Sequence, residues 1–272
     1  MTILVTGATA NIGRLVVDQL IARGATTDIR ALTIDPGIAA LPEGVQVVRG
    51  HLGRPGSLSA AFEGVDRMYL APSPGTVAEV LELARAAGVR HVVDLSGEPE
   101  SWWGSVCNAV EGSGLAWTHL WPADFMENTM TWSQQIRDNG AVREPHPDTA
   151  SAPIAMNDIA AVAATALLTD GHLGRAHALA GPEILSRTDL LAHLADALDR
   201  EITFRTSTRE ETITALRPTM GDNATWYVDN VLIDFAPTPE SLPITSVEDI
   251  TGKPATTFSQ WAHANAARFL AD

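Results

Sequence analysis

The sequence predicts an α/β fold with a doubly wound parallel sheet, followed by a smaller and mainly helical C-terminal lobe. Three observations support this expectation. Short apolar runs alternate with helical patterns through the first half, the first run enters a helix through a turn that contains glycine, and the second half is less regular. Strands that alternate with helices at this spacing are typical of a parallel sheet.

Six strands are expected in the first half, because each run is short, apolar and rich in β-branched residues. They cover residues 2–6, 28–34, 45–49, 67–71, 89–95 and 115–120. Apolar side chains at helical spacing predict helices between these strands, over residues 14–23, 57–64, 76–87 and 102–111.

The second half is expected to contain more helix than strand. Helices are predicted over residues 156–168, 186–198, 208–216, 223–235 and 257–270, strands over 176–180 and 202–205, and a loop with three prolines over 237–243. We therefore expect two domains, residues 1–150 and residues 151–272. The second is expected to be interleaved with the first as a lobe or lid, and not to be independent.

Composition excludes several classes of function. The net charge is −15 and the only lysine is Lys253, so the chain lacks the basic surface that nucleic acid or an anionic membrane requires. The single cysteine, Cys107, excludes an internal disulfide and an all-cysteine metal cluster, and the eight histidines show no ligand spacing, so no metal is expected. We expect a cytoplasmic protein without a secretory leader or membrane span, acting on a small molecule, with a homodimer as one option.

The turn between the first strand and the first helix has the chemistry of a phosphate site. Gly7 allows a tight turn, Gly13 allows the helix to pack close to the sheet, and the start of a helix offers free N–H groups to an anion. Ala10 stands where a further glycine would let the backbone approach a pyrophosphate, and its methyl group is tolerable if φ is negative. The alternative is a strand–turn–helix that binds nothing.

Ligands of doubly wound sheets bind beyond the carboxyl ends of the strands. This rule selects the turn over residues 7–13 and the segments that follow the later strands. Those segments include Asp35, His51, Ala71, Ser96 and the stretch that starts at Pro122.

The chain resembles the NmrA-like branch of the atypical short-chain dehydrogenases/reductases. The resemblance rests on residues 6–13, 29–32, 64–66, 87–93, 113–118, 121–128, 157–160 and 251–258, and it covers nearly the whole chain. It implies a Rossmann fold that binds NAD(P)H in residues 1–150, and oxidoreductases such as quinone or azo reductases. Some relatives only sense the nucleotide. The residues expected to bind the cofactor are Gly7, Thr9, Ala10, Asn11, Ile12, Gly13, Asp35, Ala71, Ser96 and Pro122.

Three positions depart from this family pattern. Ala10 replaces a glycine, Ile34 replaces an arginine that pairs with the 2′-phosphate of NADP, and His51 replaces an acid near the adenine. Asp35 lies 22 residues after Gly13, where an acid favours a ribose 2′-hydroxyl, so NAD is slightly favoured over NADP. The alternatives are that Asp35 only forms a turn with the next two residues, and that no cofactor binds.

The proton relay of ordinary short-chain dehydrogenases is absent, because neither Tyr69 nor Tyr227 is followed four residues later by a lysine. Candidate catalytic residues therefore come from the strand ends: Glu98, Trp103 beside Trp102, and Asp124. The tryptophans could stack an aromatic substrate or simply pack in the core, and Asp124 could handle a proton or cap a helix.

The leading hypothesis is an NAD(P)-dependent oxidoreductase that transfers hydride to a small aromatic, quinone or carbonyl substrate. One alternative is a cofactor-independent isomerase, cyclase or dehydratase on the same scaffold. Another is a regulator that senses a nucleotide without catalysis.

Overall fold

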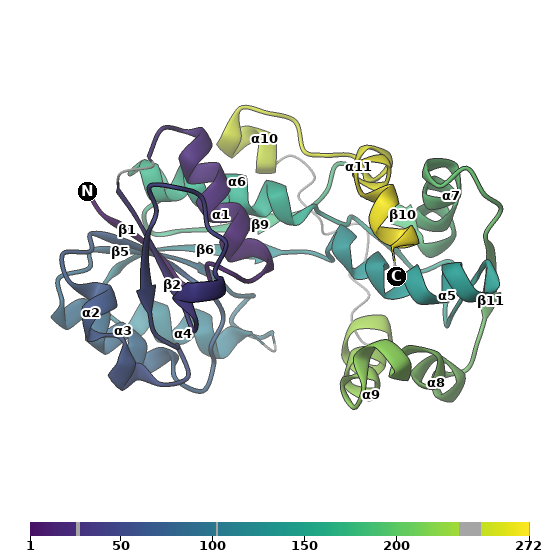
Figure 1. The fold of residues 1–272 in the computed structure, drawn as a ribbon, viewed down its shortest axis with the longest axis horizontal. Helices are drawn as coiled ribbons and strands as arrows, with labels where there is room; N and C mark the ends of the chain where they lie inside the picture. Colours follow the sequence, from purple (N-terminus) through teal and green to yellow (C-terminus); the bar gives the residue numbers. More distant parts are fainter. Residues whose placement is uncertain (26–27, 102, 234–245, 272) are drawn as a thin grey trace. The chain divides into compact units, whose positions relative to one another are not determined.

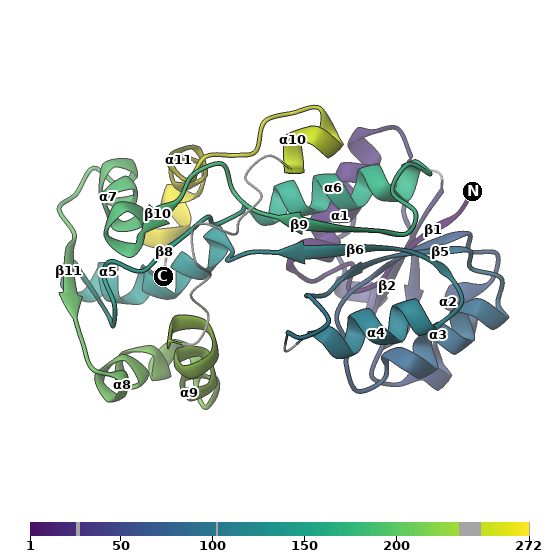
Figure 2. The same ribbon diagram turned by 180° about the vertical axis from the view of Figure 1, so that it is seen from behind.

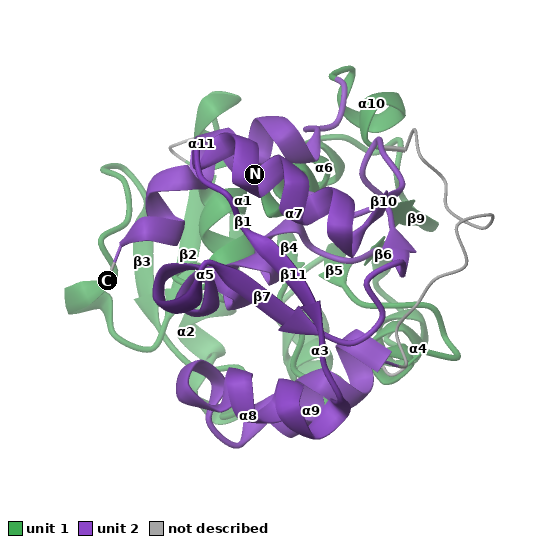
Figure 3. Ribbon diagram, turned by 90° about the vertical axis from the view of Figure 1, so that its right-hand side faces the viewer, with its two compact units in different colours: residues 1–122, 156–179, 246–253 green, residues 123–155, 180–245, 254–272 purple. Residues whose placement is uncertain are grey.

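The computed structural model describes residues 1–25, 28–101, 103–233 and 246–271, and the chain forms two compact units (Figure 3). Unit 1 contains residues 1–122, 156–179 and 246–253, and unit 2 contains residues 123–155, 180–245 and 254–272. These units do not coincide with the expected division at residue 150. Residues 123–150 group with unit 2, whereas residues 156–179 return to unit 1.

Unit 1 is built on a parallel sheet with the strand order β3-β2-β1-β4-β5-β6-β9. Its strands are β1 (Ile3–Val5), β2 (Ile29–Thr33), β3 (Gln46–Arg49), β4 (Arg67–Leu70), β5 (His91–Leu95), β6 (Ala116–Pro122) and β9 (Arg175–Leu179). The first six match the six strands expected in the first half. The seventh comes from the second half, so the sheet is not complete within residues 1–150.

Helices cover both faces of this sheet, which confirms the doubly wound fold (Figures 1 and 2). One face carries α1 (Asn11–Ala22) and α6 (Met156–Leu168), with α10 (Ser246–Thr251) packed on α6. The other face carries α2 (Ser59–Phe62), α3 (Val77–Ala86) and α4 (Gly104–Gly112). Along the chain, a short 3-10 helix precedes β3 at η2 (Pro36–Ile38), and another follows it at η3 (Pro55–Ser57). Apolar side chains of α2, α3 and α4 pack on those of the strands and form a buried core, for example Val80, Val106 and Val92.

Unit 2 is mainly helical, with two small strand pairs. Its helices are η4 (Met126–Trp132), α5 (Ser133–Asn139), α7 (Arg187–Ala197), α8 (Arg209–Met220), α9 (Asn223–Tyr227), the π-helical η5 (Val228–Ile233) and α11 (Phe258–Leu270). Strand β7 (Ala141–Glu144) pairs in parallel with β11 (Thr203–Thr206), and β8 (Ala150–Ser151) pairs antiparallel with β10 (Leu185–Ser186). The expected helix over 223–235 is α-helical only as far as Tyr227, and the proline loop over 237–243 lies outside the described residues.

Three helices of unit 2 begin at a serine or threonine that caps the helix N-terminus. Ser186, Thr208 and Thr257 each accept a hydrogen bond from the backbone N–H three residues later, and the side chain of that residue binds back to the cap. This reciprocal arrangement satisfies donors that the first turn of a helix leaves without partners. The helix predicted over residues 186–198 begins at the Ser186 cap.

No helix in the described part of the chain has the length and apolarity that crossing a membrane requires.

Candidate functional site

The turn after β1 holds the backbone in a conformation that only glycine adopts easily. Gly7 has φ of +60°, in the left-handed region. A Cβ atom at Gly13 would lie 2.2 Å from the carbonyl oxygen of Gly7, far inside van der Waals contact. Both glycines are therefore required for α1 to start this close to β1, as expected from the sequence.

Ala10 does not obstruct this turn. It is the residue before α1, its φ is −88°, and it caps the helix with no side-chain hydrogen bond. A methyl group is unstrained at this φ, which meets the condition set by the sequence. Asn11, Ile12 and Gly13 form the first turn of α1, and their N–H groups have no carbonyl partner within the helix.

The side chain of Thr6 ties the glycine turn to the neighbouring strand β4. Its hydroxyl donates to the Tyr69 carbonyl over 3.0 Å and accepts from the Ala71 N–H over 2.8 Å. Ala71 is consequently close to Gly7, since a Cβ atom added to Gly7 would lie 3.1 Å from the Ala71 methyl group. Thr9 is exposed, and its hydroxyl lies 3.4 Å from that of Thr33 at the end of β2.

Ser96 and Pro122 lie along the same edge of the sheet as Ala71. Ser96 directly follows β5 and Pro122 ends β6, and β4, β5 and β6 are neighbours with parallel register. The Ser96 side chain is 5% exposed, and its hydroxyl oxygen has no hydrogen-bond partner among the described residues. Since a buried hydroxyl without a partner is unfavourable, Ser96 has unused capacity to bind a ligand.

Asp35 follows β2 and is exposed. Its Oδ1 accepts the Gly37 N–H over 3.0 Å, so the turn predicted as one alternative does form. The Oδ2 atom carries no hydrogen bond within the described residues. Arg49, at the end of β3, donates from Nε to the Ile34 carbonyl over 3.1 Å and brings a positive charge to the same turn.

Glu98 and Trp103 occupy different environments. Glu98 is exposed, and its carbonyl accepts from the backbone and the hydroxyl of Ser101. Trp103 precedes α4 and packs, half-buried, against the core of unit 1, which agrees with the packing alternative. Trp102 lies outside the described residues.

Asp124 belongs to unit 2 and is held by two polar neighbours. Its Oδ1 accepts from the Asn128 amide over 2.7 Å, and its Oδ2 accepts from the Ser151 hydroxyl over 3.3 Å. Burial raises the pKa of the Asp124 carboxyl, against the hydrogen bond from Asn128 and the charge of Arg187, which lower it. Asp124 therefore keeps its proton to higher pH than an exposed aspartate.

A further acid of unit 2, Glu144, was not found from the sequence. Glu144 is fully buried, accepts the Trp132 indole N–H over 2.6 Å and pairs with Arg187 over 2.8 Å. Burial also raises the pKa of the Glu144 carboxyl, and the Arg187 charge opposes this effect. Together with Asp124 and Tyr227, these residues line a small cavity.

Tyr227 lines the same cavity, and its phenol holds its proton to higher pH than an exposed tyrosine. Burial, assisted by the negative charges of Glu144 and Asp124, raises the pKa of its phenol. No short motif pointed to this cluster, because its members come from η4, β7, α7 and α9 and are far apart in the chain.

Comparisons with known proteins agree with the chemistry of the glycine turn. Residues 7–98 match a protein family described as NAD(P)H-binding. The chain is 34% identical to the (4-alkanoyl-5-oxo-2,5-dihydrofuran-3-yl)methyl phosphate reductase of Streptomyces griseus subsp. griseus over 98% of this chain and 99% of that protein. It is 34% identical to the NAD(P)H azoreductase of Xenophilus azovorans, with the same coverage.

A solved structure shares the fold over almost the whole chain. The triphenylmethane reductase of Citrobacter sp., complexed with NADP(H), superposes with a TM-score of 0.85 at 20% identity, over 97% of this chain and 100% of that one. At this identity the likeness concerns the fold.

Proposed function

The chain belongs to the NmrA-like family of NAD(P)H-binding, atypical short-chain dehydrogenases/reductases, and we infer from this membership that it is an NAD(P)H-dependent reductase of small molecules. We propose an aromatic substrate with an azo, quinone or carbonyl group as the hydride acceptor. Two relatives that match nearly the whole chain are both named reductases, the (4-alkanoyl-5-oxo-2,5-dihydrofuran-3-yl)methyl phosphate reductase and the NAD(P)H azoreductase.

The observation that carries this proposal is the open start of α1. Gly13 packs on the Gly7 carbonyl, Ala10 leaves the helix uncapped by any side chain, and the first-turn N–H groups suit the pyrophosphate of a dinucleotide. The buried, unpartnered hydroxyl of Ser96 is a second group that fits a polar ligand at this edge of the sheet. A bound nicotinamide would supply the hydride.

We propose that both nucleotides bind and that NADH is slightly favoured. The Asp35 carboxylate, with one oxygen free of the turn, can accept a ribose 2′-hydroxyl and repels a 2′-phosphate. Arg49 weakens this preference, because its guanidinium group binds the Ile34 carbonyl beside the same turn. The ratio of the two affinities is therefore set by opposing charges.

We propose that Asp124 delivers the proton that accompanies hydride transfer. Its raised pKa keeps a proton available, and its hydrogen bonds to Asn128 and Ser151 hold the carboxyl in one orientation. Glu98 is the competing donor, but it is exposed and lacks such positioning. Trp103 is assigned the lesser role of an apolar wall.

Calorimetric titration of the purified protein with NADH and with NADPH tests the proposal. Micromolar binding of either nucleotide, followed by its oxidation when azo compounds or quinones are added, is the expected result. Binding without turnover of any acceptor would favour a nucleotide sensor. Turnover of a substrate in the absence of nucleotide would favour a cofactor-independent enzyme.

A further inference from the structure

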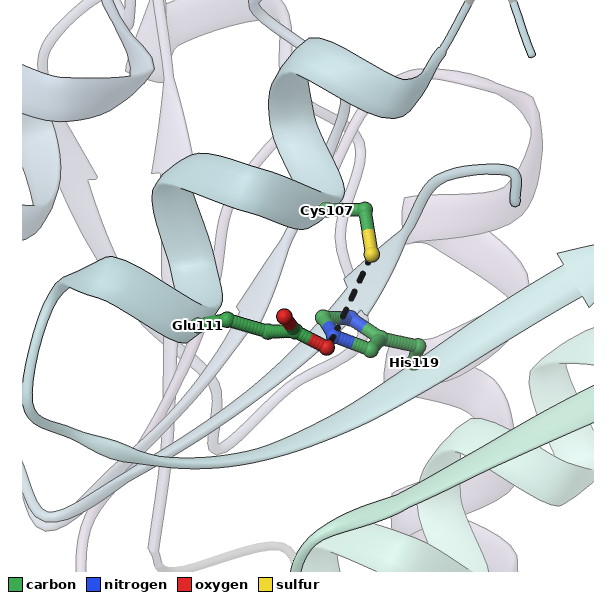
Figure 4. Close-up of side chains that lie close together, drawn as sticks. All are labelled: Cys107, Glu111 and His119. Carbon is green, nitrogen blue, oxygen red and sulfur yellow. Dashed lines mark hydrogen bonds and ion pairs between the residues drawn. The ribbon is translucent and has the colours of Figure 1, made fainter. Parts of the chain in front are cut away.

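The tertiary structure brings the single cysteine into contact with a buried histidine and a glutamate. Cys107 and Glu111 lie one turn apart on α4, and both face the imidazole of His119 on β6 (Figure 4). The Cys107 Sγ lies 3.5 Å and the Glu111 Oε1 3.6 Å from the His119 Nε2, and the three donor atoms all lie within 4.8 Å of one another. From these contacts we propose that Cys107, Glu111 and His119 form a binding site for Zn²⁺.

The spacing of the three donors suits a tetrahedral ion. Zinc binds thiolate sulfur at about 2.3 Å, imidazole nitrogen at about 2.0–2.1 Å and carboxylate oxygen at about 2.0–2.2 Å. Tetrahedral angles then place the ligand atoms roughly 3.3 to 3.6 Å apart. The two separations measured at His119 Nε2 are already in or next to this range, so binding requires little movement of that ring.

The ring of His119 is fixed in the orientation that a ligand needs. Its Nδ1 lies 2.6 Å from Asp94 Oδ2, and the Trp117 ring stacks on it with centroids 4.2 Å apart. A carboxyl group on the second nitrogen of a histidine is the usual support of histidine ligands, because it sets both the tautomer and the direction of the free nitrogen. In this site the free nitrogen is Nε2, which faces Cys107 and Glu111.

The choice of metal follows from the donor set. Sulfur, nitrogen and one carboxylate oxygen suit zinc, whereas magnesium and calcium prefer shells made of oxygen. A thiolate, a carboxylate and a neutral imidazole carry two negative charges, which match a divalent cation. Binding exchanges the thiol proton of Cys107 for the cation and leaves one tetrahedral position for water.

The cation can reach this site from solvent through Glu111. Cys107 and His119 are fully buried, whereas the Glu111 side chain is 46% exposed. The ion would tie α4 to β6 within unit 1. It would therefore stabilise the fold of that unit by binding the folded state alone.

The experiment uses the purified, untagged full chain after treatment with a chelator and without nucleotide, so that its outcome does not depend on the proposed reductase activity. Co²⁺ serves as the spectroscopic probe, Zn²⁺ competes with it, and equilibrium dialysis gives the stoichiometry. We expect one cation per chain, a thiolate-to-cobalt charge-transfer band that Zn²⁺ removes, and a higher melting temperature with Zn²⁺.

Three variants locate the cation. Cys107→Ala should abolish the band and the zinc-induced rise in melting temperature, and Glu111→Gln should weaken binding by at least about tenfold. Glu82→Gln, an exposed acid on α3, should bind as the wild type does. Glu111→Gln keeps the test decisive if Cys107→Ala unfolds, because Glu111 is partly exposed.

Two results would overturn the proposal. One is the absence of stoichiometric binding to the wild type. The other is a cation that stays bound with unchanged affinity in Cys107→Ala or Glu111→Gln, which would place it elsewhere, for example at His172 and His177, whose ring nitrogens lie 3.2 Å apart.

Discussion

Asp94 and His119 stand opposite each other on β5 and β6 and meet through a 2.6 Å contact between Asp94 Oδ2 and His119 Nδ1. Both side chains are fully buried. Loss of one partner from such a pair leaves a polar group without a partner inside the sheet, which is strongly destabilising.

We therefore expect Asp94→Ala to lower the free energy of unfolding by about 3 kcal/mol. Asp94→Asn should cost less, because its amide oxygen still accepts the Nδ1–H of His119. Urea denaturation measures both values. Asp18→Ala, which removes a partly exposed pair with Arg14, is the control and should change stability by less than about 1 kcal/mol. Equal losses in Asp94→Ala and Asp18→Ala would contradict the importance of burial.

Gly13→Ala tests the close contact between α1 and the glycine turn. In an open helix this substitution stabilises by up to about 1 kcal/mol, whereas here the new methyl group meets the Gly7 carbonyl at 2.2 Å. We expect a loss of roughly 1–3 kcal/mol in stability and at least tenfold weaker NAD(P)H binding. Melting curves and calorimetry measure the two effects.

Gly171→Ala is the matched control for Gly13→Ala, because nothing lies within 4 Å of the Cβ position at Gly171. It should leave nucleotide affinity unchanged. Wild-type affinity in Gly13→Ala itself would place the nucleotide away from this turn.

Ser96→Ala separates stability from binding. The Ser96 hydroxyl is buried without a partner in the described structure, so its removal should leave stability unchanged or raise it by about 1 kcal/mol. Cofactor affinity should fall by roughly fivefold to tenfold, since the ligand loses one hydrogen bond. A variant that loses stability but binds NADH normally would assign Ser96 to the fold and not to the cofactor.

Asp35→Asn tests the balance between the two nucleotides. The amide oxygen can still accept the Gly37 N–H, so the turn is preserved while the negative charge is removed. Affinity for NADPH relative to NADH should rise by about tenfold, which corresponds to about 1.4 kcal/mol. Arg49→Gln should shift the same ratio the other way. An unchanged ratio in both variants would exclude this turn from the ribose subsite.

Asp124→Asn tests the proposed proton donor. Burial raises the pKa of Asp124, and a donor works only while it is protonated, so kcat should fall as the pH rises through this raised pKa. The variant should lose this pH dependence, and its kcat should fall by about a hundredfold. Its nucleotide affinity should be retained. Asp148→Asn, an exposed acid of unit 2, is the control. If Glu98→Gln shows the loss in place of Asp124→Asn, the proton comes from Glu98.

The sequence alone determined the features that depend on neighbours along the chain. The period of apolar residues predicted six strands of the parallel sheet and the helices between them. Gly7 and Gly13 predicted the turn at α1, and the helix predicted over residues 186–198 matches α7. Such signals can be read because strand alternation, helix periodicity and capping each act within a few residues.

The tertiary structure alone decided which distant residues meet. The register of β5 and β6 places Asp94 beside His119, and packing of α4 then adds Cys107 and Glu111 to the same site. The return of residues 156–179 to unit 1, and the pairing of Glu144 with Arg187 in unit 2, have the same origin. Strand register and helix packing are fixed by burial summed over the whole core, and no short stretch of sequence carries that information.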